Sequence, residues 1–238
     1  MNAQLQGQAK SDYVQKMFGR VARRYDIMNR LMTGWQDLRW RKFVVKKAQV
    51  PPNGALLDLA TGTGDIAFET LKVTPSATVI GADFALPMMH VGQNRKGGDK
   101  VRWSGADALR LPFPDDSFDA VTSGYLLRNV IDIPQTLREQ YRVLKAGGRI
   151  VVLDSSPPPK NILRPFIMIH LRYIIPILGR IIVGKEGADA YRYLPESTQA
   201  FKTPQELVSL LKEAGFEDVA YQSFMFGTMC VHWGVKKA

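Results

Sequence analysis

A glycine-rich motif lies between an apolar run and a helical pattern. Its sequence is LDLATGTGD, at residues 57–65. Glycines at such a turn let the backbone approach a ligand closely. Asp83 follows Gly64 by 19 residues and ends a second apolar run, which is the expected position of a carboxylate that accepts hydrogen bonds from ribose hydroxyls. The motif and this acid together predict a nucleoside-binding site.

Two classes of nucleoside cofactor fit the motif. A dinucleotide site has the pattern G-x-G-x-x-G, and Ala67 stands here at the third glycine position, which such sites sometimes tolerate. An S-adenosylmethionine site has an acid before the glycines, which Asp58 supplies. It often has a further acid beside an apolar residue after the third strand, which Asp107 and Ala108 supply. We favour S-adenosylmethionine over the alternative that these are ordinary strand-end acids, because three acids occupy matched positions.

Each acid has its own role under this interpretation. Asp83 binds the ribose, and Asp107 accepts a hydrogen bond from the adenine amino group. Asp58 supports the loop or, through water, the methionyl amine. No metal site is predicted. The predicted cofactor-binding residues are Asp58, Ala60, Thr61, Gly62, Thr63, Gly64, Asp83, Asp107, Ala108 and Gly124.

The elements that position these residues alternate between apolar runs and helical patterns. This alternation predicts an α/β fold with a parallel sheet and helices on both faces. Strands are expected at 55–60, 78–82, 101–104, 118–122 and 149–153, and helices near 87–94 and at 134–144. Two amphipathic helices, 11–31 and 36–48, precede them, and a helix at 203–214 and two strands, at about 219–224 and 229–235, close the chain.

The composition is that of a globular protein with an excess of positive charge. The chain has 238 residues, a net charge of +10 and one cysteine, which suits one α/β domain in a reducing cytoplasm. Residues 1–10 lack the apolar core of a signal peptide and are expected to form a disordered tail. Eleven Lys and Arg against three Asp lie in residues 10–47, and five cations without an acid lie in residues 160–185. These segments indicate nucleic acid or an anionic membrane face as a partner, unless they are a solvated surface.

Residues 160–185 are apolar and long enough to span a bilayer. Three arginines, a histidine and two prolines interrupt the segment, and each charge at the bilayer centre costs about 2.5–3.5 kcal/mol. A spanning helix is therefore not expected. The pattern predicts instead a segment at the membrane interface that forms the wall of an apolar pocket. A buried helical lid or a homodimer face is the alternative.

Three sequences in the chain are specific motifs: YDIMN at 25–29, LRNV at 127–130 and YRYLPES at 191–197. Through them the chain resembles, over residues 11–237, the ubiquinone/menaquinone biosynthesis C-methyltransferase family. The resemblance implies a Rossmann-like class I methyltransferase fold, with a seven-stranded, mostly parallel sheet whose last strand is antiparallel. It implies an N-terminal helical cap at 11–50, an S-adenosylmethionine-binding core at 51–158, a substrate lid at 159–202 and closing elements at 203–238.

The resemblance also implies an activity, which is methylation of a ring carbon of a membrane-dissolved polyprenyl quinol by a cytoplasmic, peripherally membrane-associated enzyme. An ionised quinol oxygen makes the adjacent carbon nucleophilic, so a cation beside that oxygen lowers the barrier. Arg128 is expected to stabilise the phenolate or orient a water, and Asn129 to position that water or a quinol oxygen. Tyr25 and Asp26 are expected to cap the pocket, and a water held by these groups is the implied proton acceptor.

Four departures from the family pattern lie at the cofactor loop and the substrate face. They leave the fold unchanged and keep a second acceptor class open, namely another hydrophobic small molecule such as a polyketide or a sterol-like compound. Thr61 replaces a glycine, Tyr125-Leu126 replaces Phe-Gly, Ile131 replaces Thr, and Asp154-Ser155-Ser156 replaces Glu-Phe-Ser.

A nucleic-acid-binding function is the alternative from another class, suggested by the basic helices of residues 10–47. The sequence lacks the Asn/Asp-Pro-Pro-Tyr/Trp motif of amino methylation, paired catalytic cysteines and an RNA-binding appendage, so no nucleic-acid partner is expected. A catalytically inactive scaffold would have a broken cofactor loop, and this loop is intact. His90, His170 and His232 are the only histidines, and structural roles are expected for all three.

Overall fold

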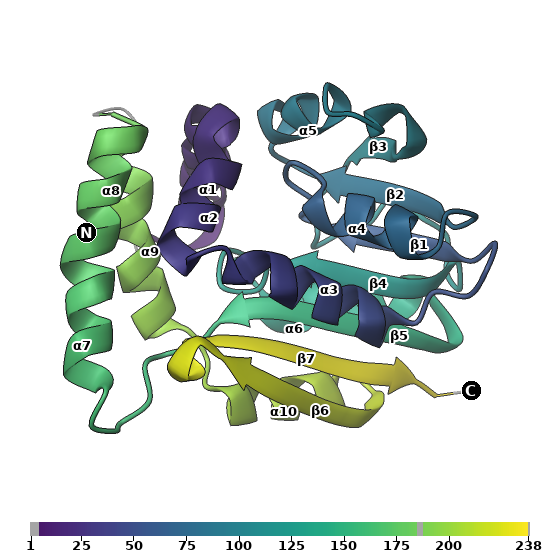
Figure 1. The fold of residues 1–238 in the computed structure, drawn as a ribbon. Coiled ribbons are helices and arrows are strands. Elements are labelled where there is room, and N and C mark those ends of the chain that lie inside the picture. Colours follow the sequence, from purple (N-terminus) through teal and green to yellow (C-terminus); the bar gives the residue numbers. More distant parts are fainter. Residues whose placement is uncertain (1–4, 185–187, 238) are drawn as a thin grey trace.

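A seven-stranded sheet forms the centre of the computed structural model, which describes residues 5–184 and 188–237. The strand order is β3-β2-β1-β4-β5-β7-β6 (Figure 1). β1 to β5 pair in parallel, and β7 is antiparallel to both β5 and β6, so the predicted sheet is confirmed. The strands are β1 (Ala55–Leu59), β2 (Thr78–Asp83), β3 (Arg102–Gly105), β4 (Phe118–Gly124), β5 (Leu144–Ser155), β6 (Phe216–Phe224) and β7 (Met229–Lys236).

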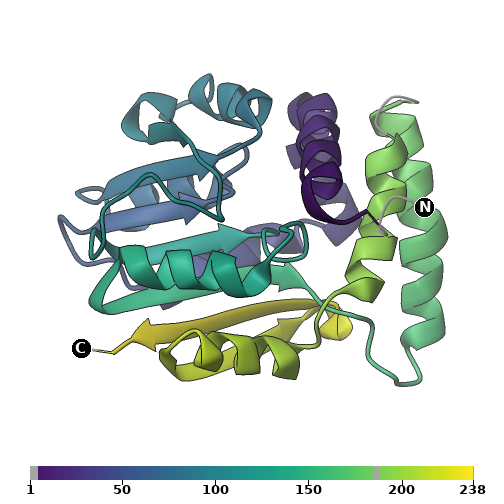
Figure 2. The ribbon, with the colours of Figure 1, turned by 180° about the vertical axis from the view of Figure 1, so that it is seen from behind.

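Helices cover both faces of the sheet (Figures 1 and 2). α3 (Gln36–Ala48) and α4 (Asp65–Val73) pack on one face, and α6 (Ile133–Val143) and α10 (Pro204–Glu213) pack on the other. α5 (Leu86–Gln93) follows β2 and contacts the N-terminal helices. The central strands β1, β4 and β5 are buried between the two layers, which is why they are apolar on both faces.

The start of α10 is confirmed in detail. Thr203 is the N-cap, and its hydroxyl accepts a hydrogen bond from the backbone N–H of Glu206 while the Glu206 carboxylate accepts one from the backbone N–H of Thr203. Pro204 is the first helical residue. This capping box pairs backbone donors that have no partner inside the helix.

The N-terminal cap differs from the prediction at both ends of its first helix. α1 (Gly7–Val21) begins inside the segment predicted to be a disordered tail, so that prediction is wrong for residues 7–10. The cause is a tertiary contact: Lys10 Nζ donates to the backbone carbonyls of Arg128 and Val130, at 3.1 and 2.7 Å. The single helix expected at 11–31 is divided by a 3₁₀ turn, η2 (Ala22–Arg24), from α2 (Tyr25–Thr33). Residues 1–4 lie outside the described part of the chain.

The insertion after β5 folds into helices that stand apart from the sheet, beside α1 and α2 (Figure 1). Leu171 and Ile175 pack against Met28 and Met32 of α2. Lys185, the last cation of the segment 160–185, lies outside the described residues. The elements are α7 (Arg164–Ile169), the π-helical segment η4 (His170–Ile174), α8 (Ile175–Ile182) and α9 (Ala188–Ala200); the first three form one continuous helix.

The fifth strand begins earlier than predicted. A helix was expected to run to residue 144 and the strand to start at Arg149, but β5 starts at Leu144, which pairs with Phe118. The register then shifts between Phe118 and Ala120. Gly147 has a φ of +74°, a backbone conformation that glycine adopts without steric cost, so the strand bends there instead of ending.

His232 predicts a pH dependence of stability. Its ring lies on β7, stacked 5.3 Å from the Tyr221 ring, with Nε2 3.1 Å from the Pro204 carbonyl. Burial disfavours the imidazolium and lowers the pKa of His232 from 6.5 to about 4. Between these values the unfolded chain binds more protons than the folded chain, so this group lowers the free energy of unfolding as the pH falls from 6.5 towards 4.

We therefore expect His232→Phe, which keeps the stacked ring, to lose less stability than the wild type on acidification. The difference should reach at most about 3 kcal/mol across this window. Urea unfolding at pH 7 and pH 4.5 measures it, with His90→Phe at an exposed position as the control. Equal acid sensitivity of the wild type and His232→Phe would contradict the assignment.

Candidate active site

Two cavities lie at the carboxyl ends of the parallel strands. The larger has a volume of about 420 Å³ and is enclosed by α1, α2, the helices of the insertion and the turn before β7. Its lining is mainly apolar, and Tyr25, Arg128 and Asn129 are its main polar residues near the sheet. These are three of the four residues that the sequence predicts to be catalytic.

The smaller cavity lies beside the ends of β1, β2 and β3. Of the predicted cofactor-binding residues, Ala60, Asp83, Asp107 and Ala108 line it. The parallel register of these strands, with Leu59 opposite Ala82 and Asp83 opposite Gly105, brings these positions to one edge of the sheet. Asn129 lines this cavity as well as the larger one, so the two cavities share a wall.

The outer wall of the smaller cavity is α1. Ser11 and Val14 face the strand ends across a volume of only about 60 Å³. Binding sites for small molecules usually measure several hundred Å³, so we expect α1 to move outward when a whole nucleoside enters. Such a movement would break the hydrogen bonds from Lys10 to the carbonyls of Arg128 and Val130 and from Gln15 to the carbonyl of Phe84.

Asp58 lies beneath the glycine-rich loop. Its carboxylate accepts hydrogen bonds from the hydroxyls of Thr61, at 2.7 Å, and Thr122, at 2.9 Å. Burial raises the pKa of Asp58 to about 6 although these bonds oppose the shift. Of the two predicted roles of Asp58, support of the loop is the one that these contacts favour. Thr61, which stands where the family has glycine, supplies one of the contacts.

Asp83 holds the loop from the other side. Its carboxylate accepts hydrogen bonds from the backbone N–H of Gly62 and of Ala85, both at 2.8 Å. A carboxylate oxygen has two lone pairs, so both oxygens can still accept from a ribose. Burial raises the pKa of Asp83, and the backbone donors oppose that shift.

The remaining predicted cofactor residues form the turn or lie outside it. Gly62 and Gly64 have positive φ angles of 56° and 85°, and a Cβ on Gly64 would lie 2.7 Å from the Trp103 ring. Thr63 donates its hydroxyl hydrogen to Asp26 at 2.7 Å. Gly124 ends β4 and is outside both sets of lining residues.

Asp26 therefore lies at the cofactor loop and not in the larger cavity. It accepts the hydrogen bond from Thr63 and forms an ion pair with Arg95 at 3.3 Å. Burial raises the pKa of its carboxyl, and the nearby Asp65 raises it further. Asp26 therefore connects α2 to the loop, whereas Tyr25, the preceding residue, lines the larger cavity.

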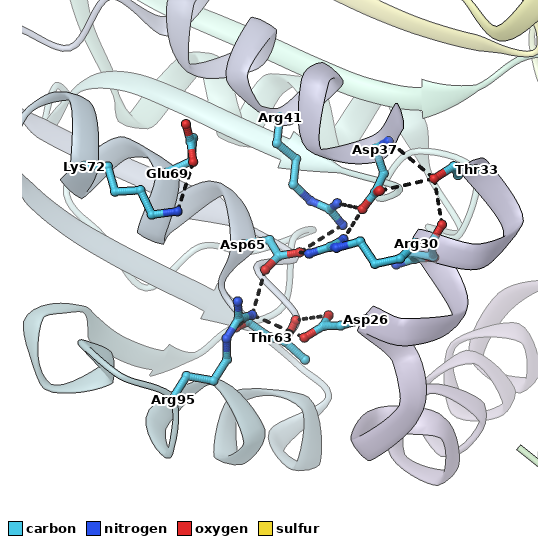
Figure 3. A network of polar contacts seen from close by, with 11 residues as sticks. Asp26, Arg30, Thr33, Asp37, Arg41, Thr63, Asp65, Glu69, Lys72 and Arg95 are labelled. Carbon is cyan, nitrogen blue, oxygen red and sulfur yellow. Dashed lines mark hydrogen bonds and ion pairs between the residues drawn. The ribbon is translucent and has the colours of Figure 1, made fainter. Parts of the chain in front are cut away.

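An ion-pair network joins α2 and α3 to the start of α4 (Figure 3). Arg30 Nη2 lies 2.7 Å from Asp65, Arg41 Nη2 lies 3.3 Å from it, and Arg95 Nη1 lies 2.7 Å from it. Arg30 and Arg41 also bind Asp37, which is fully buried. Burial alone would raise the pKa of Asp65, but the three guanidinium groups outweigh it and lower the pKa to about 2.

Arg128 is buried, and Asp154 is its counter-charge. Nη1 lies 2.7 Å from Asp154 Oδ1, and the Arg128 backbone N–H donates to Oδ2 at 3.2 Å. The guanidinium also stands 4.9 Å from the centre of the Tyr125 ring. Burial by itself would lower the pKa of Arg128, but Asp154 reverses this and raises it, so the residue is a permanent cation at the edge of the larger cavity.

Asn129 is held through its amide. Nδ2 donates to the Tyr125 carbonyl at 2.7 Å, which leaves Oδ1 buried and without a partner among the described residues. Tyr125 has a φ of +60°, unusual for a side chain of its size. This strained residue contacts both Arg128 and Asn129, and such strain is often found at functional sites.

Several residues of the site were not predicted. Asp154 was noted only as a departure from the family pattern, although its place at the end of a parallel strand is the same signal that identified Asp83. Asp65 ends the glycine-rich motif, but its pairing with Arg41 was not predicted, because that pairing depends on how α3 packs. Tyr191 and His170 also line the larger cavity; the first was part of a motif, and the second was expected to be structural.

The strand order, the antiparallel β7 and the glycine-rich loop that follows β1 together define a class I methyltransferase. The chain belongs to the ubiE/COQ5 methyltransferase family, whose model matches residues 6–236, and S-adenosylmethionine is the methyl donor of that class.

Individual relatives agree with this assignment. The chain is 51% identical to "Ubiquinone/menaquinone biosynthesis C-methyltransferase UbiE" of Desulfotalea psychrophila, over 96% of this chain and 92% of that protein. It is 45% identical to "Demethylmenaquinone methyltransferase" of Thermus thermophilus, over 92% and 99% of the two chains. A methyltransferase solved with the Haloferax volcanii Trm112 activator shares the fold, with a TM-score of 0.66 and 18% identity over 93% and 98%.

The position of Asp83 predicts its effect on cofactor binding. Asp83→Asn removes the negative charge and one acceptor, so we expect the affinity for S-adenosylhomocysteine to fall at least about tenfold. Calorimetric titration measures it, with Asp99→Asn at an exposed carboxylate as the control. An unchanged affinity in a folded Asp83→Asn protein would exclude the ribose contact.

Proposed function

We propose that this protein methylates a ring carbon of a polyprenyl naphthoquinol of the demethylmenaquinol type, using S-adenosylmethionine. The observation that carries the proposal is the shared wall at Asn129: the cavity lined by Asp83 and Asp107 adjoins an apolar cavity of about 420 Å³. The names of the relatives that are 45% and 51% identical support a quinone as the acceptor.

S-adenosylmethionine supplies an electrophilic methyl group when it is bound. Asp83 and Asp107 would hold its ribose and adenine, since both line the smaller cavity. Ala60 lines the same cavity, and the backbone N–H of Gly62 donates to Asp83. α1 and the loop close this region from water, which strengthens each polar contact inside it.

The residues around the acceptor favour its ionised form. Arg128 is a cation in a poorly hydrated cavity, where its attraction to a phenolate oxygen is stronger than in water. Ionisation of that oxygen places negative charge on the adjacent ring carbon. Asn129 Oδ1 would accept from a water or a hydroxyl at the same place, and that water takes the quinol proton. Burial raises the pKa of Tyr25, so Tyr25 stays a neutral donor.

The departures from the family pattern bear on the identity of the acceptor. Tyr125 and Ser155 both line the larger cavity, and the Ser155 hydroxyl accepts a hydrogen bond from Thr198 of α9 at 3.1 Å. The strand end and the insertion are therefore tied together where the ring would lie. A naphthoquinol and a benzoquinol, offered separately with labelled methyl donor, distinguish the acceptors by the mass of the product.

The role of Arg128 is tested in the same assay. We expect Arg128→Ala to lower kcat by about 100-fold or more, because a charge that stabilises the transition state is lost, while the affinity for S-adenosylhomocysteine changes less than about twofold. Arg138→Ala, on the exposed face of α6, is the matched control. Normal turnover by Arg128→Ala would remove this residue from the mechanism, and absence of methyl transfer by the wild type to every quinol would contradict the proposed function.

We also propose that the insertion rests on an anionic membrane surface, which makes this a cytoplasmic, peripherally associated protein. The helix Arg164–Ile182 has the length and composition of a membrane span. However, Leu171, Ile175 and Gly179 are buried against the protein, and Arg172 lies near the middle, which favours an interfacial position. The opposite face is an exposed apolar stripe at three- and four-residue spacing, formed by Ile162, Phe166, Ile169, Tyr173, Ile177 and Ile181.

The cations of this segment flank the stripe. Lys160, Arg164, Arg172 and Arg180 are all exposed, and residues 160–182 contain no acid. Phe166, which is 70% exposed, also lines the larger cavity. The apolar surface is therefore continuous with the substrate pocket, as a lipid-dissolved substrate requires.

Flotation with liposomes that contain phosphatidylglycerol tests this contact. Changing Arg164, Arg172 and Arg180 to Glu should abolish most of the flotation, since each cation near an anionic surface contributes about 1 kcal/mol. The control carries three Glu at the exposed Lys72, Lys100 and Lys212. Unchanged flotation of the variant would contradict the role of these cations. No flotation of the wild type, together with a dimer in sedimentation that is lost on Phe166→Asp, would replace the membrane with a second copy of the chain.

A further inference from the structure

Residues that line the larger cavity have buried polar atoms without a hydrogen-bond partner among the described residues. One is Asn29 Nδ2, on α2. The other four are Arg128 Nε, Asn129 Oδ1, His170 Nε2 and Tyr191 Oη. An unpaired polar atom costs about 1–3 kcal/mol when it is buried. Such atoms in a pocket therefore mark the positions where a ligand supplies the missing partner.

Apart from Asn29 on α2, these atoms come from two different walls. Arg128 and Asn129 follow β4, at the sheet and next to the cofactor cavity. His170 begins η4 and Tyr191 belongs to α9, both in the insertion, which Figure 1 shows beyond α1 and α2 from the strand ends. A ligand between the walls therefore meets a pair of polar residues at each end.

The backbone at His170 is unusual. The helix Arg164–Ile182 is α-helical except for the π-helical segment His170–Ile174. A π turn fits an extra residue into one turn, rotates the side chains that precede it relative to those that follow, and occurs frequently at functional sites. Leu171 and Ile175 keep the apolar contact with α2 and Tyr191, while His170 lines the cavity.

The position of Tyr191 depends on a glycine. A Cβ on Gly179 of α8 would lie 2.5 Å from a ring carbon of Tyr191, which is too close for any residue but glycine. The close approach of α8 buries the ring, leaving Tyr191 only 5% exposed. Burial also raises the pKa of Tyr191, so its hydroxyl stays protonated and can donate.

We propose that His170 and Tyr191 bind the second oxygen of the quinol, the one on the far side of the ring from the oxygen next to Arg128. The proposal rests on the proposed function and specifies which acceptors the site selects. A hydroxyl at this place donates its hydrogen to His170 Nε2 and accepts one from Tyr191, which satisfies both groups. Two oxygens in para positions on one ring match two polar ends on opposite walls.

This orientation also assigns the two oxygens different states. The oxygen near Arg128 is stabilised as an anion, whereas the oxygen between His170 and Tyr191 remains a neutral hydroxyl. In demethylmenaquinol one hydroxyl is on the ring carbon next to the carbon that accepts the methyl group. The prenyl chain is attached next to the other hydroxyl, which is para to the first. That chain then points along the insertion towards Leu163 and Phe166, which line the cavity and are exposed.

Two substrates test the proposal: demethylmenaquinol with a short prenyl chain, and the analogue that lacks the hydroxyl beside the prenyl group. Both retain the oxygen that activates the accepting carbon. We expect the wild type to have a kcat/KM about tenfold or more higher for the dihydroxy compound, the effect of losing a buried hydrogen-bonding group. In Tyr191→Phe and His170→Leu this preference should shrink towards one, with matched controls Tyr141→Phe and His90→Leu.

The preference separates a binding role from a structural one, because a distorted pocket would lower the rates for both compounds together. Equal rates for the two compounds with the wild type, or an unchanged preference in both variants, would overturn the proposal while leaving the methyltransferase activity established. Absence of methyl transfer to either compound by the wild type would instead overturn the proposed function. Measuring the affinity for S-adenosylhomocysteine in each variant verifies that the cofactor site is intact.

Discussion

The buried carboxylate of Asp65 is the point on which the arrangement of the site depends. It is the first residue of α4, directly after the glycine turn, and it binds guanidinium groups from α2, α3 and the segment after α5. Loss of one partner in such a buried cluster leaves charge uncompensated, which typically costs about 3–5 kcal/mol. The N-terminal cap is thereby held to the cofactor loop by charge as well as by apolar contact.

Both cavities depend on that attachment. α2 supplies Tyr25 and Met32 to the wall of the larger cavity, and Asp26, on the same helix, binds Thr63 of the loop. A shift of α2 would change the substrate pocket and the cofactor loop together. The network contains six ionic side chains, and apart from Asp26 and Arg95 they have little solvent exposure, so salt screens the pairs around Asp37 and Asp65 only weakly.

A second buried ion pair, Arg128 with Asp154, places a cation at the larger cavity. The proposed mechanism uses a cation at the edge of an apolar pocket, and a lone guanidinium there would be costly to desolvate. Asp154 compensates the charge through two contacts and leaves Arg128 Nε buried without a partner among the described residues. On the other wall, the insertion contributes neutral polar groups and an apolar outer face. Charge is therefore concentrated at the sheet end, next to the cofactor cavity, and the lid end suits a neutral hydroxyl and a prenyl chain.

The local sequence alone determined the sheet, the cofactor loop and the family. The alternation of apolar runs with helical patterns predicted the strands, because the spacing of apolar residues in a strand or a helix can be read from neighbouring residues in the sequence. The acids at strand ends were predictable for the same reason: parallel strands bring their carboxyl ends to one edge. The motif at 127–130 identified Arg128 and Asn129, and the structure places both at the wall between the cavities.

Only the tertiary structure decided which side chains contact each other across distant segments. Residues 7–10 are helical because Lys10 reaches carbonyls more than a hundred residues away, and no local pattern contains that contact. Asp26 belongs to the cofactor loop, not to the substrate pocket, because Thr63 lies opposite it. The π segment at His170 and the contact of Gly179 with Tyr191 likewise arise from helix packing. Local sequence specifies the spacing of apolar residues and the residue types at turns. Burial and electrostatic pairing depend instead on distances between segments that only the folded chain brings together.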